Sequence, residues 1–172
     1  TVHFVVQRLR KSGRMTAEMW GMSLAHFGVG IFVIGVLMVE STKLETDVAV
    51  VPGQTVSARG YDFQFLGVEQ VPGPNYLADR GHVMVTRDGR EVADLWPEKR
   101  AYASGGQVMT EAAINAGVFR DVYVALGEPL DTTGTWAMRL YVKPFIRWIW
   151  FGALLMALGG FVAAADKRFR RT

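Results

Sequence analysis

Cysteine is absent from the 172 residues, and histidine occurs only at positions 3, 26 and 82. The lack of cysteine excludes a disulfide framework, a thiolate metal site and a cysteine nucleophile. So few histidines argue against a multi-histidine zinc site. The charged residues, 19 Lys+Arg and 16 Asp+Glu, are also missing from two long segments, and half of the chain is hydrophobic. This distribution disfavours an ordinary soluble enzyme.

Two long apolar runs are present instead. The first, Trp20–Val39, has 20 residues with His26 as its single ionisable group, and the second, Trp148–Ala165, has 18 residues without charge. A helix of 20 residues is about 30 Å long, which matches the hydrocarbon core of a bilayer. Core helices of a soluble domain are the alternative, but two such runs in so short a chain argue against it. The first run also lacks the small-residue cleavage site of a signal peptide. We interpret both as transmembrane helices.

Basic residues flank both runs on one side. Four precede the first run and four follow the second, namely Arg8, Arg10, Lys11, Arg14, Lys167, Arg168, Arg170 and Arg171. The positive-inside rule then predicts that both termini are cytoplasmic. The predicted organisation is a cytoplasmic basic segment at 1–17, spans at 18–40 and 144–165, an outer domain at 41–143 and a cytoplasmic basic tail at 166–172. Because the basic clusters are topology signals, they do not indicate a nucleic-acid partner.

The segment between the spans has the pattern of β-strands. Apolar residues alternate with others in Tyr61–Phe65 and from Trp136 to Val142, as expected for strands with one buried face. Asp88-Gly89 is typical of a two-residue hairpin turn. Gln107–Ala116 fits a strand or a short helix, and we favour the strand. Six or seven short strands at this spacing predict an antiparallel sandwich or small barrel.

His26 is the residue most indicative of function. An imidazole in hydrocarbon is costly, so it should face other helices, pair with a polar group or bind a metal or cofactor. Ser23 and Gly30 lie on its helical face, and Gly21, Gly28 and Gly35 form a neighbouring stripe that would let a helix or a flat macrocycle approach closely. From the residues alone, a hydrogen bond to another helix, haem ligation and a proton relay all stay open.

The remaining candidates are weaker. We expect Ala153, Ala157, Gly160 and Ala164 to pack against helices, which implies further membrane partners. His82 is expected at the surface and His3 on the inner side, so neither can reach His26 as a second ligand. Ser104-Gly-Gly-Gln lacks the following Lys-Ser/Thr of a phosphate-binding loop. The carboxylates of Asp94, Glu111 and Asp121 have no spacing that selects a catalytic pair, and the chain alone does not look like a self-contained enzyme.

Several blocks resemble the CcmF/NrfE family, the membrane subunits of the haem lyase of cytochrome c maturation. They are Trp20-Gly-Met-Ser-Leu-Ala-His-Phe-Gly28, the segments that start at Ser104 and Phe119, and Trp136–Phe151. The similarity covers nearly the whole chain in order. Family members are much longer, and this chain resembles only their last portion. Whether it is a separate subunit or part of a longer polypeptide stays open.

The resemblance implies a function for His26. In its Leu-Ala-His-Phe-Gly context, His26 matches the second of two intramembrane histidines that hold a structural haem b, so the other axial ligand is expected outside this chain. The family suggests a bacterial inner membrane location with a periplasmic domain at 41–143. Its partners would be the remaining membrane portion of the lyase, membrane lipid, a periplasmic haem carrier, thiol-reducing maturation subunits and apocytochrome c. The alternative is a non-catalytic two-span envelope scaffold whose outer domain binds a protein.

Overall fold

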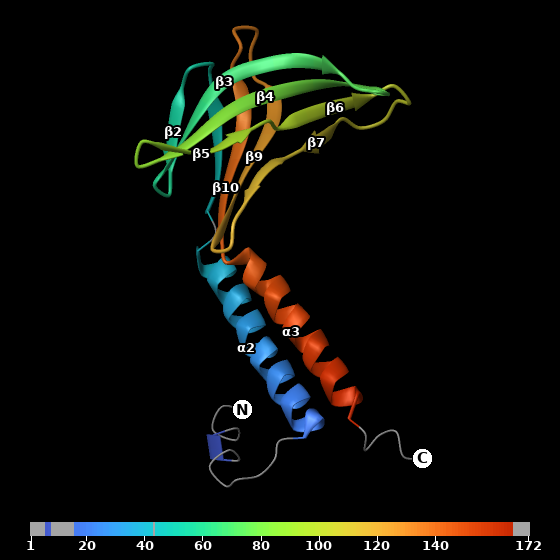
Figure 1. Cartoon of the computed structure of the whole chain (residues 1–172). Helices are drawn as coiled ribbons and strands as arrows, with labels where there is room; N and C mark the ends of the chain where they lie inside the picture. The colour runs from blue at the N-terminus through green and yellow to red at the C-terminus, as the bar shows by residue number, and fades with distance from the viewer. Residues whose placement is uncertain (1–5, 8–15, 43, 167–172) are drawn as a thin grey trace. The chain divides into compact units, whose positions relative to one another are not determined.

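The fold was analysed in a computed structural model of the chain, which describes residues 6–7, 16–42 and 44–166 (Figure 1). His3 and the eight flanking basic residues lie outside the described residues. The described residues form two compact units. One contains the helices α2 (Ala17–Thr42) and α3 (Ile146–Ala164), and the other is a β domain between them in sequence, from Thr42 to Pro144.

Helices α2 and α3 pack through glycines that have no room for a side chain. A Cβ added at Gly21 would lie 2.3 Å from the backbone nitrogen of Ala163, and one at Gly28 would lie 2.7 Å from that of Met156. The same holds for two glycines of α3. A Cβ added at Gly152 would lie 2.5 Å from a backbone nitrogen of α2, and one added at Gly159 would lie 2.4 Å from another. Close backbone contact of this kind is how small residues promote helix association in membranes.

The first turn of α2 is capped from two directions. The Thr16 hydroxyl oxygen accepts a hydrogen bond from the amide of Met19 at 3.3 Å, which is the usual role of an N-cap threonine. The amide of Glu18 donates to a carboxylate oxygen of Asp166 at 2.9 Å, across 148 positions of sequence. Asp166 is buried and lies two residues beyond Ala164, the last residue of α3. It therefore ties the end of one helix to the start of the other.

Large apolar side chains cover the outside of both helices. Leu37 of α2 and Phe161 of α3 are 62% and 75% exposed, whereas the buried positions of the two helices are glycines and Ser23. A soluble core helix would bury these side chains. Both helices are long and apolar enough to cross a membrane. This pattern fits helices that contact lipid or further helices, as the sequence predicts.

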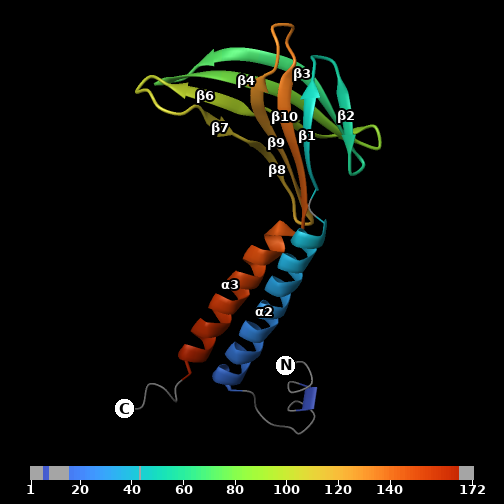
Figure 2. The ribbon, with the colours of Figure 1, turned by 180° about the vertical axis from the view of Figure 1, so that it is seen from behind.

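The β domain consists of two antiparallel sheets. The first has the order β1 (Leu44–Val50), β10 (Trp136–Pro144), β9 (Arg120–Pro129) and β8 (Ala113–Ala116). The second has the order β2 (Thr55–Ala58), β3 (Tyr61–Pro72), β4 (Tyr76–Arg87), β6 (Glu98–Tyr102) and β7 (Met109–Glu111), and β5 (Arg90–Leu95) also pairs with β4. Figure 2 shows the two sheets from behind. The expected antiparallel all-β domain is confirmed, and two sheets make it a sandwich rather than a closed barrel.

Alternating side chains from both sheets build the core. Phe63, Phe65 and Val83 come from the second sheet and Val124 and Leu140 from the first, and each is at most 2% exposed. The period-2 patterns of the sequence predicted these inward faces. Their burial supplies the main driving force for folding of the domain, at about 25 cal/mol per Å² of apolar surface.

The strands test the predicted hairpin turn, the predicted strand at Gln107–Ala116 and the predicted number of strands. Asp88 and Gly89 have φ values of 52° and 72° and join β4 to β5, so the two-residue hairpin is confirmed. Gln107–Ala116 is confirmed as β rather than helical. It is split, however, because β7 belongs to the second sheet and β8 to the first. The expected six or seven strands are too few: the described residues also form β1, β2 and β6, whose charged or polar residues hide the alternation.

Candidate functional site

His26 lies on an exposed side of α2 and bonds to its own helix. Its Nδ1 is 2.8 Å from the carbonyl oxygen of Met22, one turn earlier. A carbonyl oxygen can only accept a hydrogen bond, so this contact places a proton on Nδ1. In the neutral ring, Nε2 then carries a lone pair. The chain thus presents an imidazole with a fixed tautomer and a free ligating nitrogen.

The surface next to His26 is open. Gly30 follows His26 by one turn, and a Cβ added at Gly30 would meet nothing within 4 Å. Glycine costs a helix about 1 kcal/mol relative to alanine, and at Gly30 no crowding by the described residues requires it. Such a flat strip beside an imidazole leaves space for a broad planar group or for another helix. The donor and the space therefore fit haem ligation.

The glycine stripe of α2 and Ser23 lie on the side of the helix that packs against α3, and not on the exposed side of His26. The sequence left open whether Gly21, Gly28 and Gly35 accept a helix or a macrocycle, and in the structure all three face α3. Ser23 is 7% exposed and lies among the buried positions of α2, so it does not share the exposed side of His26. Its hydroxyl oxygen has no hydrogen-bond partner among the described residues.

The small-residue stripe of α3 does not make the contact with α2. Ala157, Gly160 and Ala164 are exposed, and a Cβ at Gly160 would meet nothing within 4 Å. The contact with α2 uses Gly152 and Gly159 instead, which lie on another side of the helix. The predicted packing role of the first stripe therefore stays a prediction about helices outside this chain.

His82 forms a compact cluster with Trp96 and Asp94 in the β domain. The imidazole and the indole stack with ring centroids 3.7 Å apart and an angle of 12° between planes. One oxygen of Asp94 lies 2.6 Å from Nε2 of His82, and the other accepts a hydrogen bond from Nε1 of Trp96 at 3.3 Å. Sequence analysis expected His82 at the surface. Its side chain is 28% exposed, and its Nε2 is engaged.

Two irregularities of strand pairing surround this cluster. The register between β4 and β5 shifts between Val85 and Thr86, and that between β3 and β4 shifts where Gly67 pairs with His82. Gly67 has a φ of 140°, a conformation that favours glycine. Bulges often re-aim side chains near functional sites. Here they frame a shallow pocket of about 230 Å³ lined by Leu66, Glu69, Arg80, His82 and Trp96, among others.

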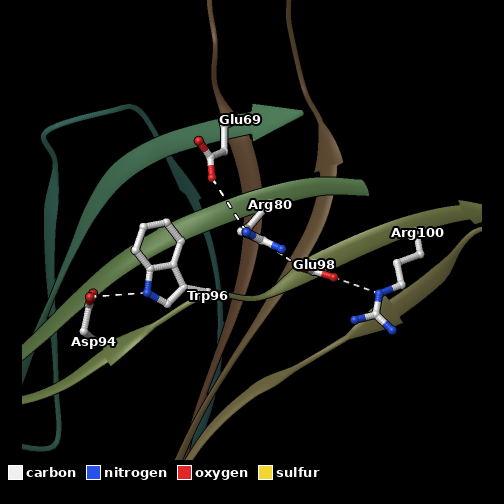
Figure 3. A network of polar contacts seen from close by, with 6 residues as sticks. All are labelled: Glu69, Arg80, Asp94, Trp96, Glu98 and Arg100. Atoms are coloured by element: carbon white, nitrogen blue, oxygen red, sulfur yellow. Dashed lines mark hydrogen bonds and ion pairs between the residues drawn. The ribbon is translucent and has the colours of Figure 1, made fainter. Parts of the chain in front are cut away.

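A charged network continues from this pocket along β4 and β6 (Figure 3). Glu98 accepts hydrogen bonds from Nε of Arg80 at 2.6 Å and from Nε of Arg100 at 2.8 Å. Arg80 also lies 4.0 Å from Glu69 and Arg100 3.6 Å from Glu111. Burial alone would raise the pKa of Glu98, but the hydrogen bonds from the two arginines outweigh it and hold that pKa below its usual range.

The structure does not bring the three carboxylates of the sequence analysis together. Asp94 bonds to His82 and Trp96, and Glu111 faces Arg100. Asp121 accepts a hydrogen bond from the amide of Gly117 at 2.9 Å. Each carboxylate thus has its own local partner. Among the described residues, no group of three or more His, Cys, Asp or Glu could hold a metal ion.

Sequence reasoning missed the cluster of His82, Asp94 and Trp96. The Asp88-Gly89 turn fixes the start of the hairpin, and an unbroken register would pair His82 with Leu95. The bulge instead pairs Val83 with Leu95 and so brings Trp96 opposite His82. A one-residue shift moves side chains to the other face of a sheet, which is why the turn alone could not predict the cluster.

Comparison with known proteins places the chain in a family. Residues 41–144 match the family model described as the CcmF C-terminal beta-sandwich. The chain is 51% identical over 91% of its length to the cytochrome c-type biogenesis protein CcmF of Pseudomonas aeruginosa, and 43% identical over 95% to that of Escherichia coli. It is also 36% identical over 81% of its length to NrfE of Haemophilus influenzae. It spans about a quarter of these relatives, at 24%, 25% and 22% of their lengths.

A solved structure shows the same fold. The chain aligns with a structure titled Cytochrome c Heme Lyase CcmF with a TM-score of 0.68, covering 87% of this chain and 25% of that one, at 18% identity. The matched β-sandwich agrees with the two antiparallel sheets described above. Together with the identities to the curated relatives, the match confirms the resemblance seen in the sequence. The chain belongs to the CcmF family of cytochrome c-type biogenesis proteins.

Proposed function

We propose that this chain is the C-terminal part of a haem lyase that assists covalent attachment of haem to apocytochrome c. Within that assembly, His26 supplies one axial ligand to a structural haem b. The observation that carries the proposal is the hydrogen bond from Nδ1 of His26 to the carbonyl oxygen of Met22, at 2.8 Å. In the neutral ring this tautomer leaves the lone pair on Nε2, on an exposed helix side, which is the arrangement that an iron-ligating histidine needs.

The surroundings of His26 support the same role. Haem iron is commonly held by histidine, and the bound haem supplies a redox-active iron. This chain provides the imidazole, holds its ring through the Met22 carbonyl and, at Gly30, offers a helix surface without a Cβ in the way. Exposed apolar neighbours such as Phe27 and Val33, at 55% and 46%, suit the non-polar body of a porphyrin.

The second axial ligand must come from elsewhere in the assembly. His82 is the other histidine among the described residues, and it belongs to the β domain, where Asp94 engages its Nε2. A lone helix would also leave most of a porphyrin in lipid. We therefore infer that the remaining membrane portion of the lyase provides the second ligand.

The proposed topology places both termini in the cytoplasm and the domain at 41–143 in the periplasm of a bacterial inner membrane. It rests on the eight basic flanking residues and on a net charge of opposite sign between the spans. In that position, the β domain can meet the haem carrier, the thiol-reducing subunits and apocytochrome c. The alternative is a non-catalytic two-span envelope scaffold whose outer domain binds a protein and whose His26 only packs.

Spectroscopy of the intact complex tests the proposal. We expect His26→Ala to remove the reduced b-type α-band while the complex still assembles, because no other group supplies that ligand. The matched control is His82→Ala, which should keep the band. For His26→Gly, added imidazole should restore the band by occupying the vacated ligand position. An unchanged band in His26→Ala, or no haem in the intact wild-type complex, would favour the scaffold.

A further inference from the structure

The turn between β8 and β9 exposes two large apolar side chains. Val118 and Phe119 are 67% and 63% exposed, among the most exposed apolar residues of the β domain. They occupy the tip of the hairpin between Ala116 and Arg120. Apolar side chains at the tip of a loop are costly in water unless something covers them.

Strand register places this turn at a particular end of the sheet. Pro144, the last residue of β10, pairs with Arg120, the first residue of β9. Leu44, the first residue of β1, pairs with Val142 of β10. The turn therefore leaves the sheet from the same end at which the chain arrives from α2 and departs to α3. Figure 2 shows β1, β10, β9 and β8 side by side in this order.

Covalent geometry keeps the turn near a membrane span. Ile146, where α3 begins, is two residues beyond Pro144. Each residue spans at most about 3.8 Å, and neighbouring strands lie about 4.8 Å apart. The path from Phe119 through Arg120 and Pro144 to Ile146 therefore has an upper bound of about 16 Å. By chain path alone, the backbone of the turn lies within about 16 Å of the start of α3.

Several polar groups at the base of the turn are paired within the hairpin. The Gly117 amide donates to Asp121 at 2.9 Å, and Arg120 donates to both oxygens of Asn115, its backbone carbonyl at 3.3 Å and its side chain at 2.5 Å. A Cβ at Gly117 would lie 2.8 Å from the carbonyl oxygen of Arg120, so the tight turn requires glycine there. Each of these pairings lowers the cost of bringing the turn to a lipid boundary, where unsatisfied polar groups are expensive.

The residues around this sheet end have the composition of a membrane interface. The ammonium group of Lys143 lies 4.7 Å from the ring centroids of both Tyr123 and Tyr141. Tyrosines with a basic neighbour are enriched at headgroup level, where an apolar ring and a polar tip are both satisfied. The opposite end of β9 differs: beyond Leu130, its turn is built around the carboxylate of Asp131, which accepts hydrogen bonds from the amides of Thr133 and Thr135.

We propose that Val118 and Phe119 form a lipid-contacting tip that inserts into the outer-leaflet interface beside the start of α3. The tip adds a third membrane attachment to the two spans and holds this end of the β-sandwich at the bilayer. The proposal rests on the proposed insertion of α2 and α3 into the membrane. The tip contacts lipid in the zone between the headgroups and the acyl chains.

Site-directed spin labelling tests this proposal. The chain has no cysteine, so single cysteines introduced by Val118→Cys, Phe119→Cys, Leu130→Cys and Val33→Cys each carry a unique label in it. The full chain is reconstituted in phosphatidylcholine–phosphatidylglycerol nanodiscs, and the collision rates of each label with oxygen and with a water-soluble nickel chelate are compared. Leu130, 55% exposed at the opposite end of β9, is the matched control.

We expect labels at positions 118 and 119 to favour oxygen over nickel and the label at 130 to show the reverse. Nickel-accessible labels at 118 and 119 would overturn the proposal. An immobilised label at 119 that neither reagent reaches would also overturn it, because protein rather than lipid would then cover the tip. The label at Val33, on the exposed side of α2, tests the spans separately: nickel access there would reject the membrane insertion on which the proposed function depends.

Discussion

In the helix pair, most glycines lie where two backbones meet, whereas in the β domain most lie where the chain turns. Gly28 of α2 has the backbone of α3 within 2.7 Å of its missing Cβ. Gly89 and Gly53 of the β domain have positive φ values and nothing within 4 Å of theirs. The same residue type is thus required for space in one region and for conformation in the other. The two regions should respond to substitution in different ways.

The two regions also differ in how they treat histidine. His26 uses one ring nitrogen for its own helix and leaves the other free, while Nε2 of His82 is engaged by Asp94 and its ring is stacked on Trp96. A histidine with a fixed tautomer and a free nitrogen is suited to bind a ligand. A histidine whose ring stacks on an indole and whose nitrogen contacts a carboxylate is suited to hold those two side chains in place. Hydrogen bonding, rather than residue type, separates the two roles.

The largest expected effect lies in the β domain and tests whether its stability depends on the sandwich core. Phe65 is 1% exposed in the sandwich core, so Phe65→Ala should lower the free energy of unfolding of the domain by about 3–5 kcal/mol through lost burial and an internal cavity. Proteolysis of the full chain in increasing urea measures this loss. Leu66→Ala, at a neighbouring position that is 38% exposed, is the control and should cost much less. Equal losses for the two variants would contradict the core assignment.

A pair of glycines on one helix gives the next largest effect. Gly28→Ala should destabilise the contact of α2 with α3 by about 1–3 kcal/mol, because its methyl group meets backbone rather than a flexible side chain. Gly30→Ala, two residues away in open space, should be neutral or should stabilise the helix by up to about 1 kcal/mol. Loss of helical ellipticity as SDS is added to the detergent-solubilised chain compares the two. Similar behaviour of both variants would show that α2 and α3 do not pack as described.

The smallest effect concerns the charged network and has a defined pH dependence. Hydrogen bonds from Arg100 and Arg80 outweigh burial and lower the pKa of Glu98, so Glu98 stabilises the domain above the ordinary glutamate pKa of about 4.3. That stabilisation is lost as the pH falls through the lowered folded-state value. Glu98→Gln should therefore cost on the order of 1 kcal/mol at pH 7, and the difference from wild type should shrink on acidification.

Urea unfolding between pH 7 and pH 3 checks this dependence. Asp88→Asn is the control, since its side chain is 91% exposed at the hairpin turn. A difference between Glu98→Gln and wild type that stays constant over this range would rule out the ion pairs as its source.

Sequence patterns predicted the fold well where one physical signal dominated. Apolar runs of membrane-spanning length indicated α2 and α3, and the alternation at Tyr61–Phe65 indicated the inward face of β3. Strands such as β6 were missed because Glu98 and Lys99 are charged but buried, with Arg80 and Glu128 as their respective partners. Such burial depends on partners that are distant in sequence, which periodicity does not report.

The candidate site was only partly predictable for a related reason. The depth of His26 in an apolar run marked it as unusual, but the Met22 hydrogen bond and the open space at Gly30 needed coordinates. Small-residue spacing suggested one packing stripe on α3, from Ala153 to Ala164, yet the coordinates show that Gly152 and Gly159 on another side of the helix meet the backbone of α2. The role of His26 as a haem ligand, and the second ligand, stay predictions.

The pairing of β1 with β10 has a consequence for biogenesis. Asp47 of β1 bonds to Arg139 of β10, 92 positions away, and Glu45 bonds to Tyr141, 96 positions away. The first strand after α2 can therefore pair only when the last strand before α3 is present. Contacts this distant form late, and an unpaired strand edge is prone to wrong association. In the proposed topology, with the β domain in the periplasm, β1 would stay unpaired until nearly the whole domain has crossed the membrane. In that topology, the sheet can close only after β10, which directly precedes α3 in sequence, has reached the periplasmic side.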